Sequence, residues 1–215
     1  GVRVLPVTQD GVIDPIALRQ TLREMSDVSL VSAMAVNNEV GSITDMQEVS
    51  RAVRRVFPEA VLHTDAVQSA CWIDLRNIWP HVDVLTLSAH KFGGPKGMGI
   101  MVVREGIVLE PLLFGGGQER DRRSGTHNVA GIVVTTAALR ITDEQRVSEV
   151  ERISILRSRL LDGLEAKIDC AKRTLTTNTV AGIAHICLEG LENESLLYLL
   201  DEHGVCASAA SACAS

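Results

Sequence analysis

Short aliphatic runs alternate with amphipathic stretches through the first half of the chain. The aliphatic runs predict strands at residues 2–7, 28–36, 60–65 and 82–87. A helix is predicted to begin at Asp14, because an N-cap residue followed by Pro15 is typical of a helix start. Thr44 and Gln47 form a capping box for a second helix, which is predicted to end near Phe57. This alternation predicts an α/β fold with an open, mainly parallel sheet.

The second half of the chain has a different pattern. After a further strand at residues 100–103, a glycine-rich loop at 115–126 leads into a long helical region at about 129–167. Dense alternating charge along that region is typical of a helix that faces solvent. The remaining residues predict a strand, a second strand at 181–188, a helix at 193–203, another strand and a loop rich in Ala and Ser.

The change of pattern indicates a domain boundary near Arg140. We expect residues 1–140 to form part of a large domain and residues 141–215 to form part of a smaller α+β domain. The total of 215 residues suits one large domain or one and a half.

Composition narrows the classes of protein that fit. The chain contains only 3 Phe, 2 Trp and 1 Tyr, so its core must be aliphatic, which favours a helix-covered parallel sheet with strands buried on both faces. A formal charge of −6 without a basic run argues against a nucleic-acid binder. No apolar stretch is long enough to cross a membrane, and the first residues lack the pattern of a signal peptide. We therefore expect a cytoplasmic protein with neither a membrane nor a nucleic acid as partner.

Polar residues fall where the predicted parallel strands end, which is where open α/β sheets bind ligands. Asn38, Asp65 and Lys91 occupy such positions. A lysine at the end of a buried strand can form a Schiff base with an aldehyde cofactor. The alternative is that Lys91 caps the strand and extends its ammonium group into solvent.

Asp65 strengthens the cofactor hypothesis. A pyridoxal phosphate ring needs a carboxylate against its ring nitrogen, and the spacing Asp65-x-x-Gln68 suits the ring nitrogen and the ring hydroxyl. Two alternatives stay open: Asp65 as an N-cap for the following segment, and His63-x-Asp65 as half of a metal site. Without a second cluster of ligands, we expect no metal.

Two further segments suit a phosphate group. Ser88 and His90 flank one residue of an extended segment, so both can point at the same anion. The glycine-rich loop ends in Arg123-Ser124-Gly125-Thr126, which offers a hydroxyl, backbone N–H groups and positive charge at a helix start. A structural hydroxyl with a surface histidine, and an ordinary flexible loop, are the alternatives.

The five cysteines are an odd number without CxxC spacing, which argues against a disulfide framework or a zinc finger. Cys213 lies in the loop of Ala and Ser, where a thiolate can act as a mobile nucleophile; an unremarkable surface cysteine is the alternative. Cys71, Cys187 and Cys206 have apolar neighbours and are predicted to be small core residues.

Taken together, these segments resemble the cysteine desulfurases related to NifS and IscS, within the class V aminotransferases. The resembling segments occur in family order and cover nearly the whole chain: residues 37–41, 63–69, 88–97, 115–126 and 208–215. The resemblance implies the fold type I of enzymes that use pyridoxal 5'-phosphate. It further implies a transferase that removes sulfur from L-cysteine, leaves L-alanine and passes sulfur to an acceptor such as an iron–sulfur scaffold protein.

The resemblance also implies a role for each site residue. Lys91 matches the Schiff-base lysine, and Asp65 and Gln68 match the partners of the ring nitrogen and the ring hydroxyl. Asn38 matches the asparagine beside the cofactor hydroxyl and the substrate. The other matches are two phosphate contacts, a threonine that reaches the phosphate of the second subunit of a homodimer, and the cysteine that carries the persulfide: Ser88, His90, Thr126 and Cys213.

The chain departs from the family pattern at its ends and in the cysteine loop. The family extends beyond both ends, with a ring-stacking histidine upstream and an arginine for the substrate carboxylate downstream, so we expect a fragment that is inactive alone. Ala210 stands where the family commonly has glycine. The rival interpretations are a selenocysteine lyase or another class V lyase, and an inactive remnant or interaction module that keeps the fold.

Overall fold

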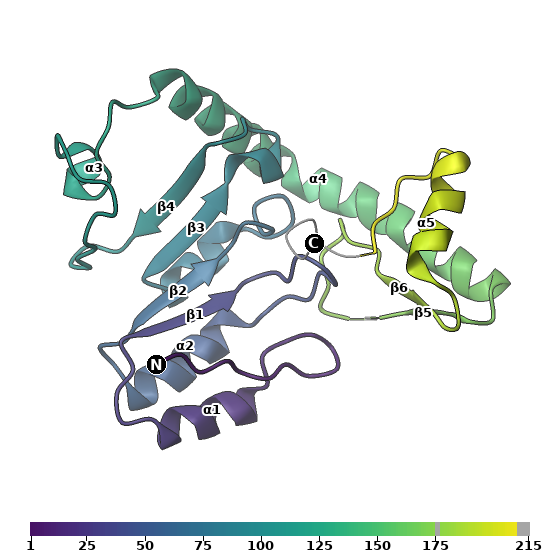
Figure 1. Cartoon of the computed structure of the whole chain (residues 1–215), viewed down its shortest axis with the longest axis horizontal. Coiled ribbons are helices and arrows are strands. Elements are labelled where there is room, and N and C mark those ends of the chain that lie inside the picture. The colour runs from purple at the N-terminus through teal and green to yellow at the C-terminus, as the bar shows by residue number, and fades with distance from the viewer. Residues whose placement is uncertain (175–176, 210–215) are drawn as a thin grey trace.

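The computed structural model describes residues 1–174 and 177–209, which form an α/β arrangement with a four-stranded sheet and a second, smaller part (Figure 1). The strands of the main sheet are β1 (Leu30–Met34), β2 (Val61–Asp65), β3 (Val84–Ser88) and β4 (Gly99–Val103), in that spatial order. The helices are α1 (Pro15–Glu24), α2 (Met46–Val56), α3 (Gln118–Asp121), α4 (Val129–Lys167) and α5 (Asn193–Glu202). The short strands β5 (Ala171–Arg173) and β6 (Ile186–Leu188) pair in the smaller part.

The first three strands of the main sheet are parallel, as the alternating pattern predicts, whereas β4 is antiparallel to β3. The predicted first strand, at residues 2–7, is wrong. Only Val7 forms an isolated bridge, to Ile13, and Val2 and Val4 are exposed, because no described strand lies beside this segment to pair with it. Likewise, the strand expected from residue 181 begins only at Ile186.

Local capping sets the helix starts. Asp14 Oδ1 accepts the Ile16 N–H at 2.8 Å, so Asp14 caps α1 as predicted. The predicted capping box of α2 is displaced by one residue, because Asp45 rather than Thr44 is the N-cap. Asp45 Oδ1 accepts the Glu48 N–H at 3.0 Å. A carboxylate caps a helix start at least as well as a hydroxyl and also favours the positive end of the helix dipole.

The core lies on one face of the sheet. Leu62, Leu85 and Leu87 point into a buried aliphatic cluster that includes Leu18 of α1 and Val53 of α2. The opposite face is less covered, since Ser32 is exposed and both His63 and Asp65 are half-buried. The opposite face is not bare, however, because Val84, which pairs with His63, is buried there.

Helix α4 joins the two parts of the molecule (Figure 1). Its residues Ala138 and Leu139 pack against the core of the main sheet, while Arg157 Nε donates to Ile183 O at 2.6 Å in the smaller part. Arg140 lies inside this helix, and the domain boundary placed there remains a prediction. Among the described residues, no helix combines the length and the apolar character that a membrane span requires.

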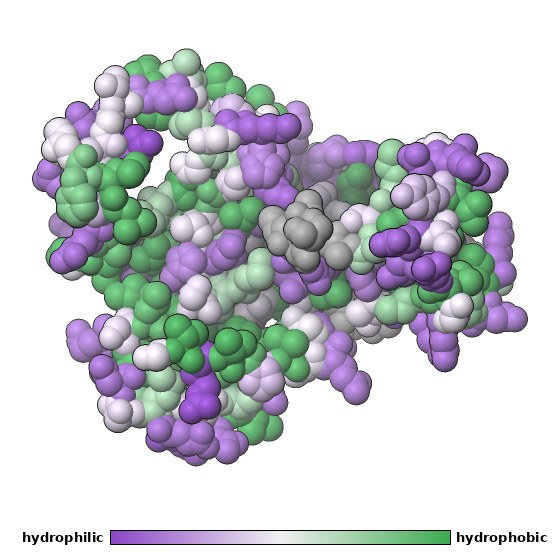
Figure 2. Space-filling model, in the orientation of Figure 1, coloured by the Kyte–Doolittle hydropathy of each residue, from purple (hydrophilic) through white to green (hydrophobic). Residues whose placement is uncertain are grey.

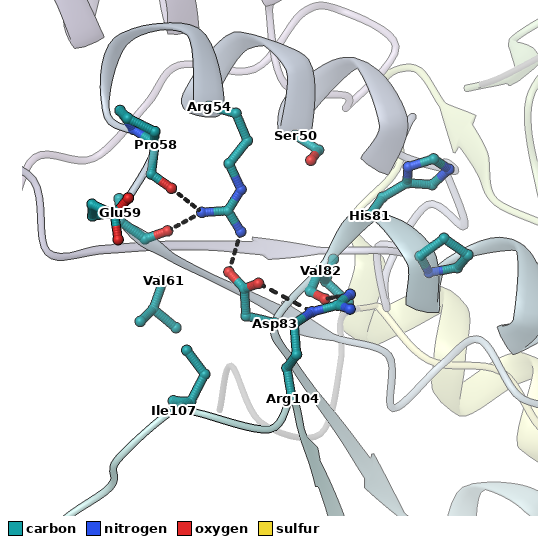
Figure 3. A pocket seen from close by; sticks show the side chains of 12 residues that line it. Ser50, Arg54, Pro58, Glu59, Val61, His81, Val82, Asp83, Arg104 and Ile107 are labelled. Carbon is teal, nitrogen blue, oxygen red and sulfur yellow. Dashed lines mark hydrogen bonds and ion pairs between the residues drawn. The ribbon is translucent and has the colours of Figure 1, made fainter.

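A buried carboxylate holds the sheet together at the end where β2 and β3 begin. Figure 3 shows Arg54, from α2, and Arg104, which follows β4, converging on Asp83. Asp83 Oδ2 also accepts the Leu62 N–H at 2.8 Å. Arg104 stacks over the Trp79 ring, 5.0 Å from its centroid. These interactions tie a helix and three strands to one side chain.

The same ion pairs line a pocket of about 350 Å³ that none of the predicted site residues borders (Figure 3). Arg54 and Arg104, which line it, are already paired with Asp83, so this part of the pocket is a structural network.

We predict that Asp83→Ala lowers the free energy of unfolding by about 3 kcal/mol, because it leaves a partly buried guanidinium and a buried N–H without their acceptor. Urea denaturation measures the loss. The control is Glu149→Ala, which removes an exposed ion pair with Arg152 and should leave the denaturation midpoint unchanged. Equal midpoints for the two variants would contradict the prediction.

Candidate functional site at the carboxyl edge of the sheet

Three parallel strands end at one edge of the sheet. The register pairs Met34 of β1 with Asp65 of β2, and Asp65 with Thr86 of β3. The pairing continues beyond the strands, since Ala35 N–H donates to Asp65 O at 2.9 Å and Ala66 N–H donates to Thr86 O at 3.0 Å. The segments that leave these strands therefore emerge side by side, which is the arrangement expected of a ligand site in an open α/β sheet.

Asp65, the predicted partner of the ring nitrogen, is the last residue of β2 and is half-buried. Its Oδ1 accepts the Val67 N–H at 2.9 Å, so Asp65 also caps the turn that follows, as the alternative interpretation holds. Within the described residues, no hydrogen bond engages Oδ2 of this carboxylate, which leaves that oxygen for a ligand. Gln68 is half-buried in the same turn.

His63 lies on the same face of β2 as Asp65. Its Nδ1 is 2.8 Å from Ser32 Oγ and its Nε2 is 3.1 Å from Thr86 Oγ1. Burial lowers the pKa of His63, and the neighbouring Asp65 opposes that shift. Both ring nitrogens therefore have protein partners. Over residues 1–174 and 177–209, no cluster of three side chains suited to a metal ion occurs, so the metal alternative gains no support.

Ser88 ends β3, and His90 and Lys91 lie in a single 3₁₀ turn, Ala89–Phe92. The extended backbone expected at His90 is wrong, because His90 lies inside this turn, which ends at Gly93 with φ +79°. The turn nevertheless brings Ser88 Oγ within 2.8 Å of His90 Nδ1. Lys91 is exposed, and no ion pair or hydrogen bond of its ammonium group occurs in the part of the chain that the structure describes.

Asn38 lies half-buried in the turn after β1. Asn37 Oδ1 shapes this turn by accepting two of its backbone N–H groups, at 2.8 and 2.9 Å. The smaller part packs against the turn, since Val180 N–H donates to Gly41 O at 2.9 Å. A Cβ on Gly41 would lie 3.0 Å from Ile183 Cβ, so the two segments approach closely.

The glycine-rich loop is held by its own contacts, including Gly117 N–H to Ser124 Oγ at 3.3 Å. Thr126 is exposed between α3 and α4. Two residues later, Asn128 caps α4 and donates to Met98 Sδ at 3.5 Å. Across the described residues, no hydrogen bond joins Thr126 to the other predicted cofactor residues, and its role stays a prediction.

The predicted nucleophile, Cys213, lies outside the described residues. Of the other cysteines, Cys71 and Cys170 are half-buried, whereas Cys187 and Cys206 are exposed. The prediction that Cys187 and Cys206 are core residues is therefore wrong. Cys187 lies on a two-stranded sheet and Cys206 follows α5, and neither position is enclosed by the main core.

The residues at this edge fit pyridoxal phosphate by the chemistry of their donors and acceptors. Asp65 offers a carboxylate oxygen to a protonated ring nitrogen. The exposed Lys91 amine can reach an aldehyde, and Ser88 and His90, 2.8 Å apart, offer paired polar groups to a phosphate.

Two side chains near Lys91 have no role in the sequence-based prediction. Cys71 donates its S–H to Lys91 O at 3.3 Å, and Thr142 of α4 donates its hydroxyl to Phe92 O at 3.2 Å. These donors are 20 and 50 residues from their acceptors, so no local pattern reveals them. Asp83 does leave a sequence signal, because it is an acidic residue at the start of an aliphatic run.

The sequence is similar to known proteins over nearly its whole length. All of residues 1–215 match the family described as aminotransferase class-V. An IscS-like cysteine desulfurase from Mycobacterium tuberculosis is 39% identical over 211 residues, which cover 97% of this chain and 53% of that protein. The cysteine desulfurase IscS of Dictyoglomus turgidum is 38% identical over 212 residues, which cover 98% of this chain and 53% of that protein. The chain therefore spans about half the length of the curated relatives it matches.

Solved structures share the fold. A NifS-like protein superimposes with a TM-score of 0.87 at 35% identity, covering 96% of this chain and 56% of that chain. A NifS-like protein from Rickettsia africae superimposes with a TM-score of 0.85 at 26% identity, covering 97% of this chain and 57% of that chain. The similarity therefore includes both the main sheet and the smaller part.

Proposed function

Because the chain belongs to the class-V aminotransferase family, we propose that it forms part of a cysteine desulfurase that binds pyridoxal 5'-phosphate. One observation carries the proposal: the segments bearing Asn38, Asp65 and Ser88 leave three parallel strands at one edge, and Lys91 follows in the next turn. The names of the relatives support L-cysteine as the substrate.

Different residues of the chain would bind different parts of the cofactor. Lys91 would hold the aldehyde carbon, Asp65 would hold the proton of the ring nitrogen, and Gln68 and Asn38 would contact the ring hydroxyl. When bound, pyridoxal phosphate supplies the electron sink for breaking the carbon–sulfur bond of the substrate. Asp65 keeps the ring nitrogen charged because a carboxylate beside a protonated nitrogen favours the charged form.

Cys213 would accept the sulfur. Its thiolate attacks the substrate sulfur, the bond between that sulfur and the substrate Cβ breaks, and the Cβ gains a proton to give L-alanine. Cys213 is left as a persulfide, which an acceptor thiol can then take up. A sulfur-acceptor protein such as an iron–sulfur scaffold is therefore a natural partner.

Exposed apolar side chains support a homodimer. Leu112 is 93% exposed and Phe114 is 83% exposed, and Val129 and Val133, at the start of α4, are exposed as well. Figure 2 shows hydrophobic side chains gathered over the region around α3 and the first turns of α4. A second copy of the chain would cover this surface, and Thr126, which lies between these segments, would then face the partner subunit.

Lys91→Ala should abolish covalent attachment of the cofactor in a full-length protein that carries this sequence. Lys91 is the lysine that follows the Ser88–His90 pair, and Lys96 is its nearest rival. Borohydride reduction followed by peptide mapping measures the attachment. A pyridoxyl label on Lys96 in the unmodified protein would overturn the assignment.

Cys213→Ala should retain cofactor binding and thermal stability but lose persulfide formation, because it removes a thiol without removing a binding group. The measurement is a mass gain of one sulfur on the Cys213 peptide after incubation with cysteine. The other four cysteines serve as internal controls: Cys71, Cys170, Cys187 and Cys206. A persulfide found on Cys206 alone would show that Cys206, and not Cys213, is the nucleophile. Undiminished alanine production by the variant would favour a lyase.

Phe114→Asp should convert the homodimer to a monomer, because it buries a charge in the contact surface. Sedimentation equilibrium measures the mass of the assembly. Val147→Asp is the matched control, since Val147 is 78% exposed at a position far along α4. Dimerisation that survives Phe114→Asp, or a monomeric parent protein, would contradict the proposed interface.

A further inference from the structure

The turn that carries Lys91 closes tightly on itself. Gly93 N–H and Gly94 N–H both donate to Ala89 O, the latter at 2.8 Å. A Cβ on Gly94 would lie only 2.9 Å from Ala89 O, so this position has no room for a side chain. A single helical turn satisfies few of its own carbonyls. The carbonyls of Lys91 and Phe92 therefore have no partner within the turn itself.

Two side chains from distant elements donate to these carbonyls. Cys71 S–H donates to Lys91 O at 3.3 Å, and Thr142 Oγ1–H donates to Phe92 O at 3.2 Å. Thr142 is a helical residue, and helical threonines commonly bond the carbonyl four residues back in their own helix. Thr136 does so, with Ile132 O at 2.9 Å. Thr142 instead bonds the Lys91 turn.

The Cys71 thiol is in the protonated form that such a donor requires. Burial raises the pKa of Cys71, and the neighbouring Arg146 opposes that shift. Arg146 is itself paired with Asp143 at 2.7 Å and with Asp74 at 3.6 Å, so two carboxylates offset its charge. At neutral pH, Cys71 is therefore a hydrogen-bond donor and a poor nucleophile.

We propose that Cys71 and Thr142 are positioning residues that fix the main chain at Lys91 and thereby aim its amine at the aldehyde of the cofactor. Cys71 lies six positions after Asp65 in the same turn region, so its bond joins the segment predicted to hold the ring nitrogen to the segment predicted to hold the aldehyde. Thr142 fixes the same turn from α4. The consequence for the cofactor rests on the proposed function.

Four variants separate donation from packing. Cys71→Ala and Thr142→Val remove the donors, whereas Cys71→Ser replaces the thiol with a hydroxyl donor and Thr142→Ser keeps the hydroxyl. Thr136→Val, on the same helix, and Cys187→Ala, on β6, are the matched controls. None of these residues is assigned a direct contact with the cofactor.

Hydrogen–deuterium exchange tests the contact without any cofactor. In the full-length protein without added cofactor, the peptide spanning residues 88–94 should exchange roughly threefold faster in Cys71→Ala and in Thr142→Val, because loss of one hydrogen bond favours local opening. The serine variants and both controls should exchange as the parent chain does. Unchanged exchange in both donor-free variants, or equally fast exchange in the serine variants, would overturn the proposal.

The full-length protein tests the consequence for Lys91. With added pyridoxal phosphate, the donor-free variants should show a shifted visible absorbance band and several-fold slower borohydride-trapped labelling of Lys91, with serine restoring both. An unshifted band with full-rate labelling would show that the contact does not aim the amine, and would overturn the proposal. A parent protein that takes up no cofactor would instead overturn the proposed function, while the exchange experiment would still decide whether the two donors hold the turn.

Discussion

Parallel pairing of β1, β2 and β3 is the constraint on which the candidate site depends. Parallel strands all end at the same edge, so residues far apart in sequence leave the sheet together. Met34 pairs with Asp65, and Asp65 pairs with Thr86, so the register determines which residue of each strand lies at that edge. A slip of one residue in β2 would turn Asp65 to the opposite face, where the aliphatic core lies. Register therefore determines whether this carboxylate is available to a ligand.

Much of the fold could be predicted from short-range signals. Asp14 followed by Pro15 marks the start of α1, and dense charge with helical spacing marks α4, which runs from Val129 to Lys167. Strand ends that carry polar residues point to the carboxyl edge, so Asp65 and Lys91 could be singled out before their surroundings were known. In each case, the physical cause lies within a few residues of the feature.

The features that sequence could not supply depend on partners distant in the chain. The segment at residues 2–7 has the composition of a strand, but a strand also needs a neighbour, which no local pattern reveals. The exposure of Cys187 depends on which residues cover β6, and the role of Thr142 depends on which backbone carbonyl lies next to α4 at that position. For α2, two adjacent residues, Thr44 and Asp45, both suit an N-cap, and only the path of the chain decides between them.

Helix α4 has a mechanical consequence as well as a packing one. With 39 residues it is about 58 Å long, so a bend of about 10° at its centre would carry one end about 5 Å sideways. A second connection resists such a swing, because the backbone bonds from Ile43 to Asn178 and from Val180 to Gly41 join the smaller part to the turn after β1. The helix and these backbone bonds therefore hold the smaller part at two separate places. A bend in α4 would therefore move the smaller part and, through these backbone bonds, displace the turn that carries Asn38 at the edge of the sheet.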